Sequence, residues 1–568
     1  MTPGIFGSLY DGENSSYHWT HHITPQKNLN NRSLAIMSGK GLGGGSAINF
    51  MFWTHASRRD VDNWGALNSG QHIWSWERFQ FYLKKAEAFV KPTAQQVDDL
   101  NLTFIDPSVH GYNGPVVNSF PGITGPFLEA WPRTFRELGL GINGDPRGGT
   151  ALGGYTPTFS VSPQTKERSY PGSVYTALAS KRPNLRVVTG ALVTKVLLKK
   201  ITGKPAAFGV SYQHGGRQQQ VRAKREVILS AGALASPKLL ELSGIGDKKL
   251  LDRLGIRTMV DSPFVGENYQ NHVMVPLGFN VEPNITTAED FNDPASFEAA
   301  MTEYMANRTG PFTAVNASSS LLSLSQLQSD GASVIPADLL DSASLGSHPY
   351  PGITAQHDLI TKSLSSNTAA AQIISLAGGF SPWFYNDTAR MFASPNDGGR
   401  YFSLLALLQQ PFSRGSVHIQ SPDARIPPIV NSGDLSHPLD LEITTQMVLK
   451  ALEIVSSPPL SGLLQHETPG ERVTLQPGYP KEGITEANVQ DFIQKYALVA
   501  AHYSGTCAMM DKKLGGVVDS RLRVYGVSRL RVVDASVFPM VPQGTINSAV
   551  IGVAELAADL VKEDYQKL

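Results

Sequence analysis

A glycine-rich stretch at residues 38–50 is the feature that most constrains what this chain can fold into. Four apolar residues, 34–37, have the composition of a short buried strand, and five glycines follow among the seven positions 39–45. Residues 46–49 can then begin a helix. Glycine main chain next to a helix N-terminus can bind an anion, because its unpaired N–H groups and the helix dipole both point outward. The alternative is a turn whose glycines only let a strand and a helix pack closely.

Residues 39–44 also read as G-x-G-x-x-G, a pattern found in dinucleotide-binding turns. The pattern is weak evidence by itself, because such a turn must open a helix and be followed, about twenty residues later, by an acidic residue that ends a second strand. Asp60 and Asp62 lie at about that distance, but no second strand precedes them. We therefore expect both to be helix-start and packing residues.

The balance of charged residues excludes several classes of protein. Among 568 residues, 48 are Lys or Arg and 48 are Asp or Glu, so the formal net charge at pH 7 is zero. No basic tract indicates a nucleic-acid partner. No apolar run approaches the roughly 18 residues of a membrane-spanning helix, and the amino terminus does not have the pattern of a signal peptide. We expect neither a nucleic-acid nor a membrane partner, and the oligomeric state stays open.

Cys507 is the only cysteine, so a disulfide within the chain is excluded and a cysteine-based metal site is disfavoured. We expect Cys507 to be a buried, small apolar residue and predict no metal site. Sequons for N-glycosylation permit a secreted or secretory-pathway protein whose signal is absent from this sequence, with a cytoplasmic protein as the alternative. The sequons are at Asn14, Asn31, Asn101, Asn284, Asn307, Asn316 and Asn386.

Hydrophobic patterning predicts a chain that mixes helices and strands. Residues 74–90 form an aromatic-rich segment that we expect to be helical. Residues 185–230 contain short β-rich runs, which predict a meander leading into a buried strand that ends at Ser230. From Asn547 onward, apolar residues recur at helical spacing and predict a last helix.

Three separated blocks resemble signatures of the glucose–methanol–choline (GMC) oxidoreductases, a family of FAD-dependent alcohol oxidases and dehydrogenases. Residues 38–65 are similar to the first signature, and residues 232–246, GALASPKLLELSGIG, are similar to the second. Residues 501–561 are similar to the carboxy-terminal part of the family. The blocks stand in family order, and weaker agreement between them extends over essentially the whole chain.

The resemblance implies an α/β fold with a Rossmann-like FAD-binding domain and an α+β substrate domain built on an antiparallel sheet. The first βαβ unit of the family, whose G-x-G-x-x-G turn holds the FAD pyrophosphate, has no counterpart in this sequence. By resemblance, residues 39–44 belong to a later loop of the family, close to the middle of the FAD. The expected FAD-binding parts are 1–65, 166–272 and 501–568, and the expected substrate-domain parts are 66–165 and 273–500.

The resemblance also implies which residues hold the FAD. Asn49 is expected beside the flavin N5 atom, Val193 at the adenine, and Asp534 along the ribityl chain and pyrophosphate. Relatives with covalent FAD carry a histidine one position before Asn49, where this chain has Ile48, so we expect noncovalent FAD. The full set of expected cofactor-binding residues is Gly44, Gly45, Ser46, Asn49, Val193, Ser230, Gly232, Asp534, Ala535 and Thr545.

His502 and Asn547 are the expected catalytic residues. By resemblance, His502 faces the flavin ring and acts on the substrate hydroxyl. A histidine that titrates near neutral pH can accept the hydroxyl proton while a hydride leaves the carbon. Asn547, where relatives carry His or Asn, can hold a substrate oxygen but cannot exchange a proton. The alternatives are a hydrogen-bonded core histidine for His502 and a helix cap without a ligand for Asn547.

The expected activity is FAD-dependent oxidation of an alcohol, either an aryl alcohol or a secondary metabolite, with oxygen or a quinone as electron acceptor. A first alternative is a non-redox relative, a cyclase or lyase that uses His502 as acid and base with the flavin idle or absent. The missing βαβ unit adds weight to this alternative and to an inactive remnant. A serine hydrolase is disfavoured, because no G-x-S-x-G elbow with a matching triad occurs. Residues 262–272 resemble a family turn that we expect to be mostly structural.

Overall fold

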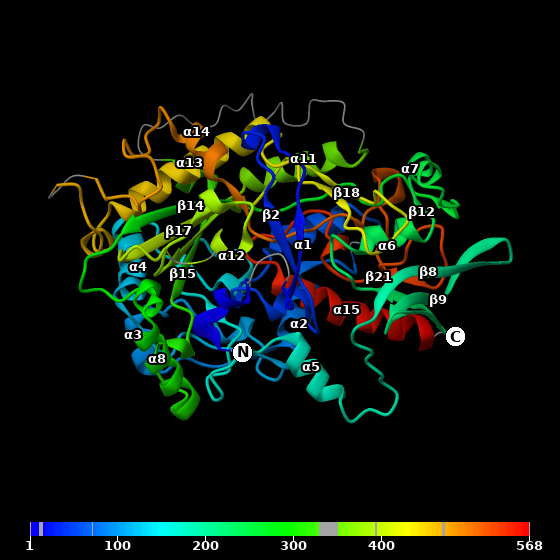
Figure 1. Cartoon of the computed structure of the whole chain (residues 1–568), viewed down its shortest axis with the longest axis horizontal. Helices are drawn as coiled ribbons and strands as arrows, with labels where there is room; N and C mark the ends of the chain where they lie inside the picture. The colour runs from blue at the N-terminus through cyan, green and yellow to red at the C-terminus, as the bar shows by residue number, and fades with distance from the viewer. Residues whose placement is uncertain are drawn as a thin grey trace.

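The computed structural model describes residues 2–10, 15–70, 72–328, 350–391, 393, 395–468 and 472–566. Figure 1 shows a wide molecule with a large sheet and its helices toward the left. A smaller β region and the carboxy-terminal helix lie toward the right. Within the described residues, no helix combines the length and the apolar character that crossing a membrane requires.

A six-stranded sheet organises the left half of the molecule (Figure 1). Its strand order is β20, β14, β17, β16, β15 and β6, and all neighbouring strands are antiparallel. The antiparallel sheet expected from the family resemblance is therefore confirmed. The strands are β20 (Leu498–Val499), β14 (Val273–Asn280), β17 (Tyr401–Leu408), β16 (Ala369–Leu376), β15 (Ala317–Ser323) and β6 (Gly153–Tyr155).

The middle strands of this sheet are buried along their whole length, so side chains pack on both of their faces. Every residue of β15 and β17 is buried. Helix α13 (Pro438–Val455) packs against β17 and β16, and helix α4 (Pro126–Glu137) packs against β15 and β6. The indole of Trp131 in α4 donates to the Ser319 carbonyl of β15 across 2.9 Å. Burial on both faces explains why these strands read as continuous apolar or small-residue runs rather than alternating ones.

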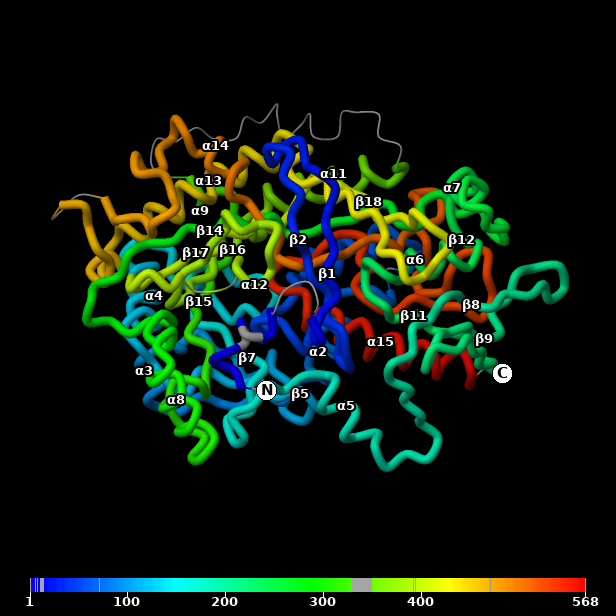
Figure 2. The backbone as a smooth tube through the Cα atoms, viewed as in Figure 1, coloured from blue at the N-terminus to red at the C-terminus, as the bar shows by residue number. Residues whose placement is uncertain are grey.

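The predicted meander and the strand that follows it are both present at the right of Figure 2. Strands β8 (Leu192–Ile201), β9 (Lys204–His214) and β10 (Arg217–Arg222) form a three-stranded antiparallel sheet. Strand β11 (Val227–Leu229) then pairs in parallel with β21 (Leu530–Val532). In the part of the chain that the structure describes, this parallel sheet consists of these two strands.

Three helices that the sequence predicts pack together, with the middle one against both of the others. They are α1 (Arg58–Ala66), α2 (Trp76–Ala86) and α15 (Asn547–Gln566). Asp60 contributes a capping box at the start of α1, which confirms its expected role as a helix-start residue. Helix α2 confirms the aromatic-rich helix, and it packs along α15, which begins at the expected residue.

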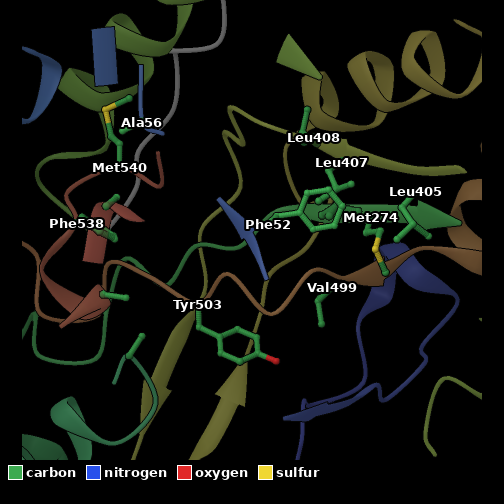
Figure 3. Packing of buried hydrophobic residues seen from close by; sticks show 14 of the residues in the cluster. Phe52, Ala56, Met274, Leu405, Leu407, Leu408, Val499, Tyr503, Phe538 and Met540 are labelled. Carbon is green, nitrogen blue, oxygen red and sulfur yellow. The ribbon is translucent and has the colours of Figure 1, made fainter. Parts of the chain in front are cut away.

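Apolar side chains from distant parts of the chain meet around these helices. The ring of Trp64 in α1 stacks on Phe538, with centroids 4.9 Å apart, and its indole donates to the Met540 carbonyl across 2.9 Å. Figure 3 shows Phe52 pointing toward Met274 of β14. The segment that leads into α15 is held against α1 by Trp64 and against the end of the large sheet by Gln409, whose side-chain oxygen accepts from the Gly544 N–H.

Shorter elements connect these units. Strands β1 and β2 form the antiparallel hairpin that is drawn in blue in Figures 1 and 2. The remaining strands are β1 (His18–His22), β2 (Ala35–Gly39), β3 (Phe52–Trp53), β4 (Glu87–Phe89), β5 (Val116–Asn118), β7 (Thr158–Phe159), β12 (Ile245–Gly246), β13 (Val260–Asp261), β18 (Ser416–His418) and β19 (Ile429–Asn431). The remaining described α-helices are α3 (Ala94–Asp99), α5 (Pro171–Ala179), α6 (Ser236–Leu242), α7 (Lys248–Arg253), α8 (Pro294–Asn307), α9 (Leu324–Leu327), α11 (Ile353–Leu364), α12 (Thr388–Met391) and α14 (Val489–Tyr496).

Candidate active site

His502 lies in a loop that residues 270–272, just before β14, hold in place. The His502 N–H donates to the Asn271 side-chain oxygen across 2.8 Å. On either side, Ala500 donates to the His272 carbonyl, and Ser504 and Gln270 exchange two main-chain bonds of 3.0 Å each. The turn at 262–272 therefore does more than shape the chain, because its last residues fix the position of His502.

The ring of His502 meets a second histidine. Its Nδ1 lies 2.9 Å from Nδ1 of His272, and the two rings are nearly perpendicular, at 84°. His272 is fully buried, whereas His502 is half-buried. Burial lowers the pKa of His502 to about 4 and the pKa of His272 well below its usual value. Both rings are therefore neutral at pH 7.

Asn547 is the first residue of α15 and is half-buried. Thr54 holds the loop that leads into α15. Its hydroxyl accepts from the Thr545 N–H at 2.6 Å and lies 2.9 Å from the Thr545 hydroxyl. The Thr545 hydroxyl also lies 3.3 Å from the Phe52 carbonyl, so it holds the loop to β3. Ser548 donates to the Thr54 carbonyl.

Gln409, the residue after β17, lies near His272 and the loop that leads into α15. Its side-chain oxygen accepts from the Gly544 N–H, three residues before Asn547. Its main chain acts on the ring of His272 and raises the pKa of that histidine, although burial and His502 lower it more. The structure thus brings the histidine pair and the N-terminus of α15 to one end of the large sheet.

The glycine-rich stretch does not begin an α-helix, so that prediction is wrong. After β2 the chain makes a single 3₁₀ turn, Gly44–Ala47, and then reverses at Met51, which has a φ of 62°. The Ser46 hydroxyl donates to the Gly43 carbonyl across 2.6 Å, which closes this short turn locally. The predicted anion site at a helix N-terminus therefore has no helix behind it.

Close packing explains only part of this glycine content. A Cβ added at Gly39 would lie 2.2 Å from the Gly44 carbonyl oxygen, so Gly39 allows a close approach of main chains. At Gly44 and Gly45, by contrast, an added Cβ would meet nothing within 4 Å. Those two glycines border open space rather than a packed neighbour.

Asn49 is fixed by an arginine that the sequence did not single out. The Asn49 side-chain oxygen accepts from Arg168 Nη1 at 2.6 Å and from the Met51 N–H at 3.1 Å. Arg168 is buried, and the same Nη1 donates to the Ser46 carbonyl across 3.2 Å. Burial lowers the pKa of Arg168 to about 10, so it remains charged at neutral pH. Arg168 therefore joins two predicted cofactor residues.

Asp534 gathers the predicted residues at the carboxyl ends of the two parallel strands. One oxygen accepts from the Gly232 N–H at 2.9 Å and from the Ser236 hydroxyl, and the other accepts from Ser536. The next residue, Ala535, accepts from the Gly505 N–H at 3.3 Å, in the same loop as His502. The carboxylate is thus used to build the turn.

Of two further predicted residues, one lies at this turn and the other lies on a different sheet. Ser230 follows β11 directly and is exposed, in agreement with its expected place at the end of a strand. Val193 stands apart, at the start of β8, where it pairs with Tyr212 of β9. Strand β8 is connected to the end of α6 by the Val196 N–H, which donates to the hydroxyl of Ser243, the residue after α6, across 2.8 Å.

These residues fit a dinucleotide cofactor. A Cβ added at Gly232, where φ is 83°, would meet nothing within 4 Å, so this main chain borders open space as Gly44 and Gly45 do. Ser230 and Ala231 are exposed at the carboxyl end of a parallel strand. Exposed main chain and small side chains in that position are what nucleotide cofactors use. Among the residues that the structure describes, no cluster of His, Cys, Asp and Glu is arranged to hold a metal ion.

Comparison with known families agrees with this arrangement. The amino-terminal domain of the GMC oxidoreductases matches residues 4–274, and the carboxy-terminal domain matches residues 411–554. A GMC oxidoreductase family protein from Malassezia sympodialis, Mala s 12, is 32% identical over 565 residues, which covers 98% of this chain and 84% of the relative. The patulin synthase of Aspergillus clavatus is 30% identical over 549 residues, covering 95% of this chain and 81% of that protein.

Solved structures show the same similarity. An FAD-dependent oxidoreductase from Chaetomium thermophilum superposes with a TM-score of 0.84 at 28% identity, covering 97% of this chain and 91% of that one. A fungal aryl-alcohol oxidase superposes with a TM-score of 0.81 at 25% identity, covering 97% of this chain and 90% of that one. The chain therefore belongs to the GMC oxidoreductase family of flavin enzymes, and its cofactor is FAD.

Proposed function

We propose that this protein oxidises an alcohol, with His502 as the general base and Asn547 as a hydrogen-bond partner of the substrate oxygen. The observation that carries the proposal is the His502 ring, which is half-buried, neutral at pH 7 and held at Nδ1 by His272. A neutral imidazole with one nitrogen held and the other directed to a site can accept a hydroxyl proton at that second nitrogen. The similarity to an aryl-alcohol oxidase supports an alcohol as substrate.

Bound FAD supplies the oxidised ring that accepts the hydride from the substrate carbon. We propose noncovalent binding, since Ile48 stands where a covalent link would need a histidine. Arg168 holds the Asn49 side chain in place for the cofactor, and Asp534 holds the turn at Gly232. The residues proposed to hold FAD are Gly44, Gly45, Ser46, Asn49, Val193, Ser230, Gly232, Asp534, Ala535 and Thr545.

The N-terminus of α15 has two parts in the proposed reaction. Asn547 orients the substrate hydroxyl toward His502, and its amide does not titrate, so it does not take up the substrate proton. The dipole of a 20-residue helix favours negative charge near its N-terminus, where the reaction places electrons. Because α15 starts in a loop tied to Thr54 and Gln409, this end of the helix is preorganised.

The proposed substrate is an aryl alcohol or another small secondary metabolite, and the proposed electron acceptor is oxygen or a quinone. The similarity to a patulin synthase and to an aryl-alcohol oxidase supports this choice. We also propose that residues 66–165 and 273–500 form the substrate domain. The large sheet supports this division, because its β6 strand comes from the first of these segments and pairs with β15 of the second.

The proposal is tested with His502→Ala and His502→Gln in FAD-loaded protein. The readout is the rate at which an aryl alcohol bleaches the flavin absorbance without oxygen. We expect the rate to fall by about 10²- to 10⁴-fold, because general-base catalysis is lost, with FAD content unchanged. His214→Ala, on the exposed end of β9, is the matched control and should leave the rate unchanged. A wild-type rate in His502→Ala would overturn the assignment. Turnover without any bleaching would instead indicate the non-redox alternative.

A further inference from the structure

We propose that Asp60 is a positioning residue for Asn547, because its carboxylate fixes the main chain of the loop that leads into α15. The inference rests on the proposed function, in which Asn547 holds the substrate oxygen. Asp60 lies at the start of α1 and is buried, with only 2% of its surface exposed. The capping box explains its bond to Ser57, but it does not explain the other bonds of this carboxylate.

The Asp60 carboxylate joins three segments that are distant in the sequence. Its Oδ2 accepts from the Ser57 N–H at 2.8 Å and from the Gln543 N–H at 3.0 Å. Its Oδ1 accepts from the side-chain amide of Gln410, the second residue after β17, at 3.1 Å. Both N–H groups belong to the main chain and can only donate, so the Oδ2 atom must be the acceptor. The start of α1, the end of the large sheet and the loop before Asn547 therefore meet at one side chain.

The loop before α15 depends on side chains for its shape, because residues 541–545 belong to no helix or strand. Three consecutive N–H groups of this loop donate to side chains from three other segments. The pairs are Gln543 with Asp60, Gly544 with Gln409, and Thr545 with Thr54. Gly544 has a φ of 72°, and a Cβ added there would lie 2.6 Å from the Thr54 hydroxyl oxygen. The loop is thus packed tightly against the residues that hold it.

A carboxylate is stabilised at this position although it is buried. Asp60 lies in the first turn of the nine-residue helix α1, where the helix dipole favours negative charge. Burial raises the pKa of Asp60, and the hydrogen bonds from Gln543, Ser57 and Gln410 oppose that rise. These donors replace much of the hydration that the carboxylate loses. The same bonds that stabilise Asp60 therefore hold the loop.

The consequence for Asn547 is a position that is set from α1. Gln543 lies four residues before Asn547, so the Asp60 bond acts on the chain just ahead of the proposed substrate contact. Without the carboxylate, the buried Gln543 N–H would lose its acceptor, and the loop would have to move to find another. A displacement of about 1 Å at a group that orients a substrate can cost a large part of the rate. Asp60 would then affect the reaction without contacting the substrate.

Hydrogen exchange of the FAD-loaded protein, measured by mass spectrometry on peptides that span residues 541–546, tests the contact directly. Asp60→Ala should speed exchange of this loop by about tenfold or more. Asp60→Asn should stay near the wild type, because one amide oxygen can accept from both main-chain N–H groups while the Gln410 amide turns to accept from the new NH₂. Ser57→Ala is the matched control, since it removes the hydroxyl that accepts from the Asp60 N–H at 3.0 Å and leaves the loop bond intact. Unchanged loop exchange in Asp60→Ala, or equal acceleration in Ser57→Ala, would overturn the inference.

Kinetics with the same variants test whether Asp60 acts through Asn547. Per bound FAD, Asp60→Ala should lower kcat/KM for an aryl alcohol by about ten- to a hundredfold, whereas Asp60→Asn and Ser57→Ala should keep most of the wild-type value. Asp60→Ala combined with Asn547→Ala should lose no more than Asn547→Ala alone, because a residue that acts through another adds nothing once that residue is gone.

Additive losses in the double variant would overturn the positioning role and leave the proposed function intact. A wild-type kcat/KM in Asn547→Ala would instead overturn the proposed part of Asn547, and the positioning role with it. The two failures are therefore distinguishable, and loop exchange shows separately whether Asp60 holds the chain.

Discussion

At the residue scale, the candidate site depends on polar side chains whose partners are distant in the sequence. Arg168 is one such residue, because its buried guanidinium holds Asn49 and the Ser46 carbonyl. We expect Arg168→Met to lower the free energy of unfolding by about 2 kcal/mol, since two charge-assisted bonds are lost. FAD occupancy should fall as well, because Asn49 loses its orientation. Urea unfolding and the visible absorbance of purified protein measure both effects. Arg186→Met, at an exposed position, should change neither quantity. Unchanged FAD occupancy in Arg168→Met would contradict the proposal that Arg168 orients Asn49 for the cofactor.

Single residues also show where sequence interpretation stops. His502 and Asn49 could be predicted as site residues because each lies in a short sequence motif. Their partners could not, because Arg168 meets Asn49 across 119 positions and His272 meets His502 across 230. A contact of that kind is set by how the strands pair, and the sequence around His272 shows only a histidine before a buried strand. The burial that makes both histidines neutral is likewise a property of the folded chain.

At the element scale, local signals predicted several helices and strands but not the individual strands of the large sheet, and they missed one turn. The meander, α2 and α15 follow from periodicity and were predicted. The prediction that residues 46–49 begin a helix is wrong, because Gly43, Gly44 and Met51 adopt left-handed backbone conformations. These conformations reverse the chain after one 3₁₀ turn. Glycine permits both outcomes, so composition does not distinguish a helix start from a reversal.

An ion cluster between two elements gives a pH-dependent prediction at this scale. His418 of β18 lies 2.7 Å from Glu241 of α6 and 3.1 Å from Glu267. Burial disfavours the charged ring, but the two carboxylates outweigh it and raise the pKa of His418 to about 10. A raised pKa stabilises the fold fully below the unfolded value of about 6.5, and this contribution is lost as the pH rises toward 10.

Urea unfolding at pH 6.5 and pH 9.5 checks this sign. The wild-type protein should lose stability between the two values, by at most about 5 kcal/mol from this group. His418→Gln should be less stable at pH 6.5 and lose less on going to pH 9.5. His72→Gln, at an exposed position, should follow the wild type. A pH dependence in His418→Gln equal to that of the wild type would show that this cluster does not contribute.

At the scale of the whole molecule, the fold and the site are assembled from segments spread over the chain. The large sheet joins β6, near residue 154, to β20, near residue 498. The order of its strands is not readable from any one of them, since several are continuous buried runs without alternation. The family resemblance implied an antiparallel sheet, and the packing of α13 and α4 explains why its strands need no polar face.

The surface of the whole molecule also predicts where the chain can carry N-glycans. Of the sequons, Asn14 lies outside the described residues, and Asn101 is half-buried in a turn with a φ of 52°. The exposed ones are Asn31, Asn284, Asn307, Asn316 and Asn386. A glycan on an exposed Asn points into solvent and costs the fold little, whereas one on a half-buried Asn must displace its neighbours.

We therefore expect protein that is directed through a yeast secretory pathway to fold with glycans at the exposed sequons and to carry little at Asn101. Glycopeptide mass spectrometry after endoglycosidase treatment measures the occupancy of each site. Asn284→Gln should remove one glycan from the intact mass, and Asn101→Gln, the matched variant, should leave that mass nearly unchanged. Full occupancy of Asn101 in active protein, with the exposed sites empty, would contradict the surface described here. Occupied exposed sites would show that the folded enzyme tolerates the modification where its surface permits it.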